Sequence, residues 1–146
     1  MRRVELARIA SADLLGFMPV KQVCYELSTI WDAVLEAALR AEVRAWRLAN
    51  EDAEPPARIA VIGMGRLGGM ELGFGSDADV LVVAEPAEQD ADSAAEGEAV
   101  KWAIGIVDKL RRRLSKPSGD PPLDVDLGLR PEGLSLIHIS EPTRPY

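Results

Sequence analysis

The stretch that decides the fold runs from Arg58 to Val83 and reads RIAVIGMGRLGGMELGFGSDADVLVV. It has an apolar run at each end, rich in β-branched residues, and glycine-rich segments between them. Such runs predict β-strands, here over residues 58–63 and 77–86. The segment Leu67–Leu72 is long enough for one or two helical turns. We therefore predict two strands of one sheet, joined by a glycine-rich connection.

The first glycine segment matches the dinucleotide-binding fingerprint. Gly63, Gly65 and Gly68 have the required spacing, and the acidic Glu85 follows at the distance expected of a ribose partner. That fingerprint, however, opens a crossover helix between parallel strands, which needs a dozen or more residues. Here only GMELGFGSDA precedes the second apolar run, and it is broken by further glycines. Dinucleotide binding therefore stays a distant alternative to glycines that merely let a turn pack closely.

Helices are predicted on both sides of this stretch. Apolar residues recur at three- and four-residue steps from Val20 to Ala49, as one face of a long helix requires. The other predicted elements are a shorter helix over Val4–Leu15, a proline-broken linker over 50–57, an acidic solvated loop over 87–98, a helix over Ala99–Leu114 and a strand over 123–129. The chain should therefore form a small sheet with flanking helices.

Composition narrows the possible partners. The formal net charge is −7 at pH 7, which disfavours nucleic acid, because phosphate-backbone binding needs clustered Lys and Arg. No apolar stretch approaches the roughly 20 residues of a spanning helix, and residues 1–15 lack the uninterrupted apolar core and small-residue cleavage site that a secretion signal would show. Cys24 is the only cysteine, so no disulfide framework is possible. We expect no nucleic-acid partner, no membrane association and a cytoplasmic location.

Two carboxylates at the start of the second strand indicate a metal site. Asp77 and Asp79 are separated by one residue, so their side chains project from the same face of the strand. Their repulsion is relieved if a hard divalent cation such as Mg²⁺ binds between them. Gly75 and Ser76, directly before them, offer backbone N–H groups and a hydroxyl to a phosphate tail. The unit could bind a nucleoside triphosphate with its metal.

A third acid on a neighbouring strand would complete such a site. The segment LDVDLGL, residues 123–129, carries Asp124 and Asp126 on one face. With these carboxylates the chemistry would follow the two-metal pattern, in which ions activate the attacking hydroxyl and stabilise in-line displacement at the α-phosphorus. No general-base histidine is needed, and the sole histidine, His138, lies near the C-terminus.

The two blocks RIAVIGMGRLGGMELGFGSDADVLVV and LDVDLGLRPEG resemble the nucleotidyltransferase domain of the glutamine synthetase adenylyltransferase family. The resemblance runs from about Arg3 to Gly133. Members of this family carry two such domains, one adding and one removing an adenylyl group in nitrogen regulation. The sequence GGMELGFGSDAD resembles the C-terminal, adenylylating half of these proteins, particularly in their actinobacterial form. The resemblance implies an α+β, DNA-polymerase-β-like nucleotidyltransferase fold.

The resemblance also implies roles for individual residues. Asp77, Asp79 and Asp126 match the carboxylates that hold the catalytic metal, and Asp124 falls outside the match. Gly75 and Ser76 match the phosphate-contacting turn. The two remaining candidate residues for nucleotide binding, at the basic positions of the two blocks, are Arg66 and Arg130, for which triphosphate contact and structural anchoring both stay open.

The implied reaction transfers AMP from ATP to a tyrosine hydroxyl of glutamine synthetase, with Mg²⁺ or Mn²⁺ as the metal. The implied partners are glutamine synthetase and, for the intact enzyme, a PII-type regulatory protein. Two alternatives stay open. One is another nucleotidyltransferase of the same fold, acting on a small molecule or nucleic acid, and the other is a non-catalytic protein-binding module.

The end of the chain departs from the family pattern. After LRPEG the sequence continues LSLIHISEPTRPY, which resembles translated sequencing-adapter read-through. We divide the chain into a helical segment (1–49), a linker (50–57), an incomplete catalytic core (58–133) and a non-native tail (134–146). The chain is accordingly expected to be a fragment that is inactive alone.

Overall fold

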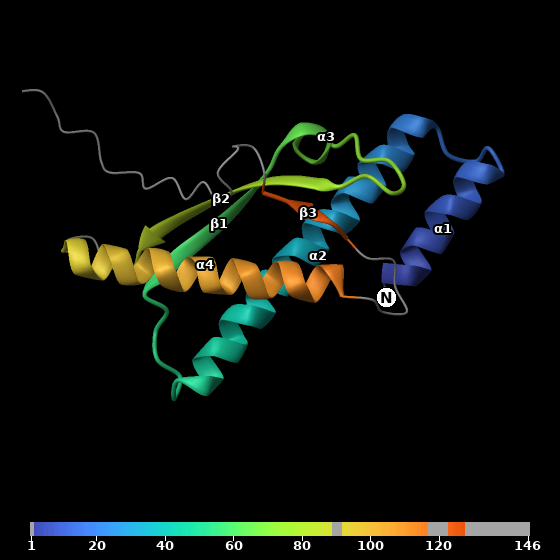
Figure 1. The fold of residues 1–146 in the computed structure, drawn as a ribbon. Helices are drawn as coiled ribbons and strands as arrows, with labels where there is room; N and C mark the ends of the chain where they lie inside the picture. Colours follow the sequence, from blue (N-terminus) through green and yellow to red (C-terminus); the bar gives the residue numbers. More distant parts are fainter. Residues whose placement is uncertain (1, 89–91, 117–122, 128–146) are drawn as a thin grey trace, which may run out of the picture.

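The computed structural model describes residues 2–88, 92–116 and 123–127. Its elements in chain order are α1 (Arg2–Leu14), α2 (Val20–Ala49), β1 (Ala57–Gly63), α3 (Gly65–Gly68), β2 (Ala78–Pro86), α4 (Ser93–Ser115) and β3 (Val125–Asp126). Figure 1 shows the sheet beside the long helices α2 and α4, with α1 folded back along one end of α2. This mixed architecture confirms the predicted α+β class.

The described strands form one sheet in the order β1-β2-β3. β1 pairs antiparallel with β2 along its whole length, from Ala57 opposite Pro86 to Gly63 opposite Val80. β3 joins the other edge of β2 in parallel. The antiparallel pairing contradicts the dinucleotide hypothesis, because that fingerprint requires parallel neighbouring strands connected by a helix.

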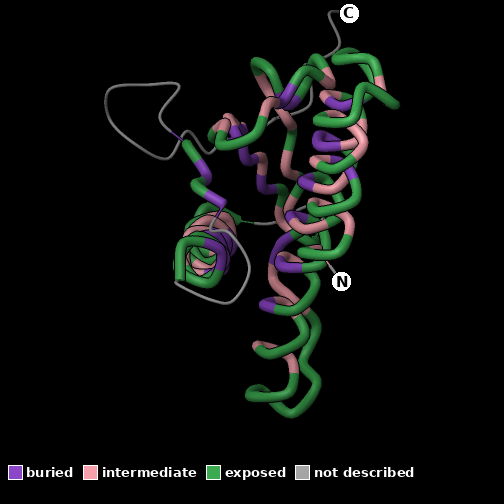
Figure 2. Tube along the Cα trace, turned by 90° about the vertical axis from the view of Figure 1, so that its right-hand side faces the viewer, coloured by how far each residue is buried: buried purple, intermediate pink, exposed green. Residues whose placement is uncertain are grey.

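One face of the sheet is covered by helices. Along β2 every second residue is buried, from Ala78 to Ala84, as expected for a strand with one face on the core. Ala78, Val80 and Val82 share a hydrophobic cluster with Leu35 of α2 and Leu110 of α4. Both helices therefore lie on the same side of the sheet, as Figures 1 and 2 show from two directions.

The opposite face of the sheet is only partly covered. Leu81 and Val83 of β2 are half-buried, and Ile62 of β1 is 45% exposed. Asp79 belongs to the same alternating set of β2 side chains as Leu81 and Val83. Asp79 therefore lies on the less covered face, where a ligand has access.

Helix α4 begins earlier than predicted. It starts at Ser93, whereas the sequence pattern predicted a solvated loop through residue 98. The physical reason is the helix cap at Asp92, whose carboxylate accepts hydrogen bonds from the N–H groups of Ala94 and Ala95 at 3.1 and 2.8 Å. Such a cap satisfies N–H groups that the first helical turn leaves unpaired. The acidic, small-residue segment after the cap is consequently helical.

The bounds of the other predicted elements differ less from those in the structure. α1 and α2 occupy the predicted regions, and α2 has the predicted bounds. The predicted linker ends one residue early, since Ala57 is the first residue of β1. Within the described part of the predicted strand 123–129, only Val125 and Asp126 pair with β2. No helix among the described residues is both long and apolar enough to cross a membrane.

Candidate functional site

The predicted carboxylates lie on neighbouring strands, at the N-terminal end of β2 and on the short strand β3. Ala78 lies opposite Val125, and Asp79 lies opposite Asp126. The pairing is extended by a hydrogen bond of 2.9 Å from the Ala78 N–H to the Asp124 carbonyl oxygen. Because adjacent strands lie about 4.8 Å apart, paired side chains of parallel strands are near neighbours on one face. The register therefore sets Asp79 beside Asp126.

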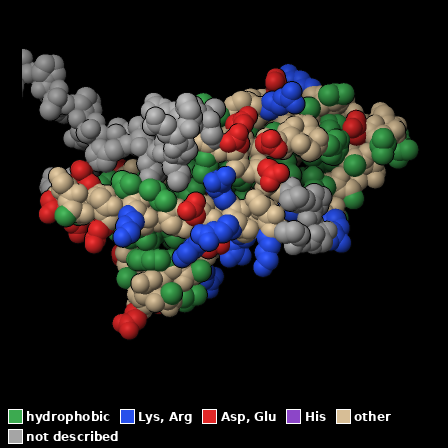
Figure 3. Space-filling model, viewed as in Figure 1, with side chains coloured by type: hydrophobic (Ala, Val, Ile, Leu, Met, Phe, Trp, Pro, Cys, Tyr) green, Lys and Arg blue, Asp and Glu red, His purple; other side chains and the backbone are tan. Residues whose placement is uncertain are grey.

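The four aspartates of the two segments differ in exposure. Asp77, Asp124 and Asp126 are exposed, whereas Asp79 is half-buried. Figure 3 shows acidic side chains gathered over β3 and the start of β2. Carboxylate oxygens are the donors that Mg²⁺ prefers, so the donor chemistry fits a divalent ion. Among the described residues, however, no three His, Cys, Asp or Glu side chains are grouped closely enough to hold a metal ion.

The segment Gly63–Gly69, here called the glycine turn, supports Asp79. Gly65 has a φ of +50°, and a Cβ built there would lie 2.7 Å from Oδ2 of Asp79. The Met64 N–H donates to the Asp79 carbonyl oxygen at 2.8 Å. A Cβ on Gly68 would lie less than 3.0 Å from the carbonyl oxygen of Gly63. The glycines thus let the turn fold tightly and lie directly against the Asp79 carboxylate.

The segment Gly73–Asp77, here called the Gly-Ser loop, leads into β2. Its turn is closed by the Ser76 hydroxyl, which accepts a hydrogen bond of 3.2 Å from the Gly73 N–H. Gly75 has a φ of +74°, and a Cβ built there meets no atom within 4 Å. The space beside this glycine is therefore open, as close approach of a ligand to the backbone requires.

The Gly-Ser loop is anchored on α2 through Ser28, a residue that sequence reasoning missed. Ser28 is fully buried. Its hydroxyl accepts a hydrogen bond of 3.2 Å from the Leu72 N–H and donates one of 2.9 Å to the Cys24 carbonyl. A serine inside an amphipathic helix gives little warning of such a role, because its partner lies far away in the sequence.

A cavity of about 580 Å³ adjoins the Gly-Ser loop. The loop contributes Gly75, Ser76 and Asp77 to its lining, and Asp124 also reaches it. The remaining lining comes mainly from α1 and α2, including Arg3 and Trp31. α1 was not predicted to belong to the site, and Asp124 was a candidate third acid that the family resemblance left out. Of the predicted metal-binding residues, Asp77 lines the cavity, while Asp79 and Asp126 lie outside its lining.

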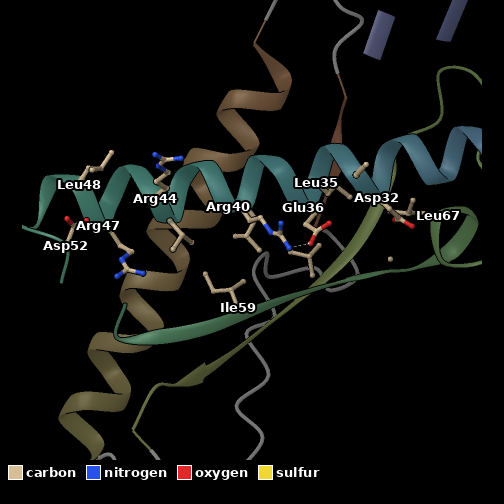
Figure 4. Close-up of a pocket in the computed structure, with 15 residues that line it drawn as sticks. Asp32, Leu35, Glu36, Arg40, Arg44, Arg47, Leu48, Asp52, Ile59 and Leu67 are labelled. Carbon is tan, nitrogen blue, oxygen red and sulfur yellow. Dashed lines mark ion pairs between the residues drawn. The ribbon is translucent and has the colours of Figure 1, made fainter. Parts of the chain in front are cut away.

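A larger groove of about 1300 Å³ lies between α2 and β1 (Figure 4). Its rim is charged, and Arg40 forms an ion pair of 2.6 Å with Glu36 across one helical turn. Partial burial raises the pKa of the Asp32 carboxyl, which also lines this groove. None of the predicted site residues that the structure describes lines it.

The structure describes only Arg66 of the two arginines that were predicted to bind the nucleotide. Arg66 lies on α3 with an exposed side chain. Its backbone carbonyl accepts a hydrogen bond of 2.7 Å from the Glu71 N–H, so the backbone at Arg66 helps to close the connection to β2. Arg130 lies outside the described residues, as does the segment assigned to the tail.

Comparison with known proteins identifies the family. The family profile described as glutamate-ammonia ligase adenylyltransferase matches residues 1–140. A bifunctional glutamine synthetase adenylyltransferase/adenylyl-removing enzyme of Corynebacterium diphtheriae is 66% identical over 138 residues, and one of Corynebacterium efficiens is 62% identical over 137. The protein of the same name from Mycolicibacterium smegmatis is 56% identical over 135 residues.

Each of these alignments covers 92% of this chain and 13% of the relative, so the chain spans about an eighth of their length. The similarity includes both glycine segments and the paired aspartates, since the family profile extends from residue 1 to residue 140. The resemblance drawn from the two motif blocks is therefore confirmed: the chain belongs to the glutamate-ammonia ligase adenylyltransferase family.

Proposed function

We propose that this chain carries the nucleotidyl-transfer site of a DNA-polymerase-β-like nucleotidyltransferase domain. The observation that carries the proposal is the parallel pairing of Asp79 with Asp126 directly after the Gly-Ser loop. Two neighbouring strands thereby present carboxylates on one face, beside a turn with free space at Gly75. Such a face suits a metal-bound triphosphate, because the ion neutralises both the carboxylates and the phosphates.

Each predicted residue has a role in this proposal. Asp77, Asp79 and Asp126 would hold Mg²⁺ or Mn²⁺, which requires the three carboxylates to draw closer together than they lie without the ion, while the Gly75–Ser76 backbone would contact the phosphates of ATP. Bound divalent ions supply charge neutralisation and a lowered pKa for the attacking hydroxyl. Arg66 and Arg130 are the basic residues available to the triphosphate. The glycine turn makes room for the Asp79 carboxylate, since a Cβ at Gly65 would lie 2.7 Å from its Oδ2.

The proposed reaction transfers AMP from ATP to a tyrosine hydroxyl of glutamine synthetase and releases pyrophosphate. The names of the curated relatives support glutamine synthetase as the target. The sequence GGMELGFGSDAD, which resembles the adenylylating half of the family, favours adenylylation over removal of the adenylyl group. For the intact enzyme we further propose a cytoplasmic location and a PII-type regulatory partner.

The proposal is tested by titrating this chain with ATP in the presence and absence of Mg²⁺. Loss of a charged metal ligand should weaken binding, so Asp77→Asn and Asp79→Asn are each expected to lower the Mg²⁺-dependent affinity by about tenfold or more. Asp108→Asn on α4 is the matched control and should leave it unchanged. ATP binding that ignores both Mg²⁺ and the two substitutions would refute the metal site.

A second experiment separates this reaction from other nucleotidyl transfers. A full-length relative is incubated with α-labelled ATP together with glutamine synthetase, RNA or a small hydroxylated acceptor. Label transferred to glutamine synthetase supports the proposed acceptor. Transfer to RNA or to the small molecule instead would identify another nucleotidyltransferase of the same fold.

A further inference from the structure

We propose that the cavity beside the Gly-Ser loop receives the nucleoside half of the nucleotide, so that α1 forms part of the binding site. This inference rests on the proposed function, because it places the base and ribose relative to the proposed phosphate turn. The cavity measures about 580 Å³, within the range of roughly 300–1,000 Å³ typical of small-molecule sites.

The cavity is continuous with the phosphate turn. Gly75, Ser76 and Asp77 all line it, and Asp124 contributes a further carboxylate. A triphosphate held at the turn therefore has its nucleoside end within reach of the same cavity. The carboxylates of Asp77 and Asp124 can accept hydrogen bonds from the hydroxyl groups of a ribose.

The remaining wall is apolar and comes from the first two helices. It is lined by Leu6, Ala7 and Ala10 of α1 and by Leu27 and Trp31 of α2. Leu27 and Trp31 are buried, with 1% and 6% of their surface exposed. A flat, weakly hydrated base gains from such a surface, since apolar area is removed from water.

The aromatic part of this wall is held in place. The guanidinium carbon of Arg2 lies over the Trp31 ring, 5.3 Å from its centroid. On the outer side of the helix pair, the Arg8 guanidinium donates a hydrogen bond of 2.5 Å to the Glu26 carboxylate. These contacts between α1 and α2 keep the wall formed before a ligand arrives, which lowers the ordering cost of binding.

The larger groove between α2 and β1 is a weaker candidate for the nucleoside. None of the residues of the Gly-Ser loop lines it, whereas Gly75, Ser76 and Asp77 line the smaller cavity. A nucleotide whose phosphates lie at Gly75 and Ser76 would have no continuous path into that groove through its lining residues. The smaller cavity is therefore the one that matches a ligand with one charged and one apolar end.

The experiment compares two probes, Mg²⁺-ATP and Mg²⁺-tripolyphosphate, by calorimetric titration of this chain. Ala10→Leu adds a larger side chain to the cavity wall. Ala7→Leu does the same at an exposed residue, where the larger side chain is less of a risk to folding. Both are expected to weaken ATP binding by about tenfold and to leave tripolyphosphate binding unchanged. Ala12→Leu, on the same helix but outside the cavity lining, is the control.

Unchanged ATP affinity in both filled variants would overturn the inference, and so would an equal loss for ATP and tripolyphosphate. Equal affinity of the unmodified chain for the two probes would also overturn it, because the nucleoside would then contribute nothing. If the unmodified chain binds neither probe, the proposed phosphate site fails, and the nucleoside assignment fails with it. Binding of neither probe therefore marks failure of the phosphate site, whereas equal binding of both probes marks failure of the nucleoside assignment alone.

Discussion

The glycine turn and the Gly-Ser loop look alike in sequence but use glycine for different physical reasons. In the glycine turn, Gly65 and Gly68 are needed because neighbouring atoms occupy the space of a side chain. In the Gly-Ser loop, Gly75 has only an unusual backbone angle, and the space around it is open. The first segment is therefore packed against the protein, whereas the second is available to a ligand.

This difference explains why the apparent dinucleotide fingerprint is misleading. Its glycines serve contacts within the fold, with the Gly63 carbonyl and the Asp79 carboxylate as the closely approached groups. Glycine spacing alone cannot distinguish internal packing from access for a phosphate, since both require the absence of Cβ. The distinction depends on what occupies the neighbouring space, and substitutions of the glycines in both segments test it.

The largest expected effect is that of Gly68→Ala in the glycine turn. The new methyl group would collide with the Gly63 backbone, which cannot rotate away as a side chain can, so we expect a loss of about 3 kcal/mol in the free energy of unfolding. Urea denaturation measures it. Gly97→Ala in α4 is the control, because a Cβ there meets nothing within 4 Å and should stabilise the helix by about 0.5–1 kcal/mol.

Removal of the Ser28 hydroxyl tests how the Gly-Ser loop is held. Ser28→Ala leaves the buried Leu72 N–H without its partner, which should cost about 1–3 kcal/mol. Thr29→Ala removes a hydroxyl that likewise donates to the carbonyl four residues earlier, but on the exposed side of α2. The expected change for Thr29→Ala in the same denaturation assay is below about 0.5 kcal/mol. Equal effects of the two substitutions would contradict the anchoring role.

The pair Gly65→Ala and Gly75→Ala compares the two segments directly. Both glycines have positive φ, so each substitution should cost about 1–2 kcal/mol from the backbone alone. Only Gly65→Ala also pushes against the Asp79 carboxylate, and it should displace that group.

The two positions are distinguished by substitution to asparagine, a residue that tolerates the left-handed region. The measurement is the free energy of unfolding of each asparagine variant relative to the alanine variant. Gly75→Asn should recover stability relative to Gly75→Ala, because its Cβ has open space. Gly65→Asn should show no such recovery. If asparagine rescues both positions alike, then the packing difference drawn between the two segments is incorrect.

The smallest effect concerns the ion pair that joins α1 to α2. The hydrogen bond from Arg8 lowers the pKa of Glu26, so the stabilisation is present above the ordinary pKa of a glutamate and is lost as the pH falls through the lowered pKa. Glu26→Gln should therefore be slightly less stable than the unmodified chain at neutral pH and equal to it in acid. Thermal unfolding across this pH range, with Glu98→Gln as control, measures the difference. A gap that persists in acid would exclude the ion pair as its source.

The sequence predicts the elements well where local patterns are strong. The apolar period of α2 and the two apolar runs of β1 and β2 locate these elements almost to the residue. The start of α4 is missed because the weakly apolar segment is made helical by one capping side chain, Asp92. A cap is a local signal, but its hydrogen bonds compete with the solvation that the acidic composition favours.

The site is predictable only in part. The Asp-x-Asp spacing indicates that two carboxylates share a face, and the register with Asp126 agrees with a third acid on the adjacent strand. By contrast, the contact between Gly65 and Asp79, the anchor at Ser28 and the α1 wall of the cavity join residues distant in sequence. No periodicity encodes such contacts, because they arise only when the helices dock on the sheet.

The uneven pairing of the sheet has a consequence for the order in which it assembles. β1 and β2 are close in the chain and pair through seven residues of each strand, whereas β3 comes from farther along the sequence and pairs through two residues. Loop-closure entropy favours the local pair first, and mutual repulsion of the carboxylates further disfavours the late step. The Ala78 amide, which donates to Asp124, should therefore exchange its hydrogen through local opening well before the rest of β2. Its exchange rate would report directly on how often the site comes apart while the protein remains folded.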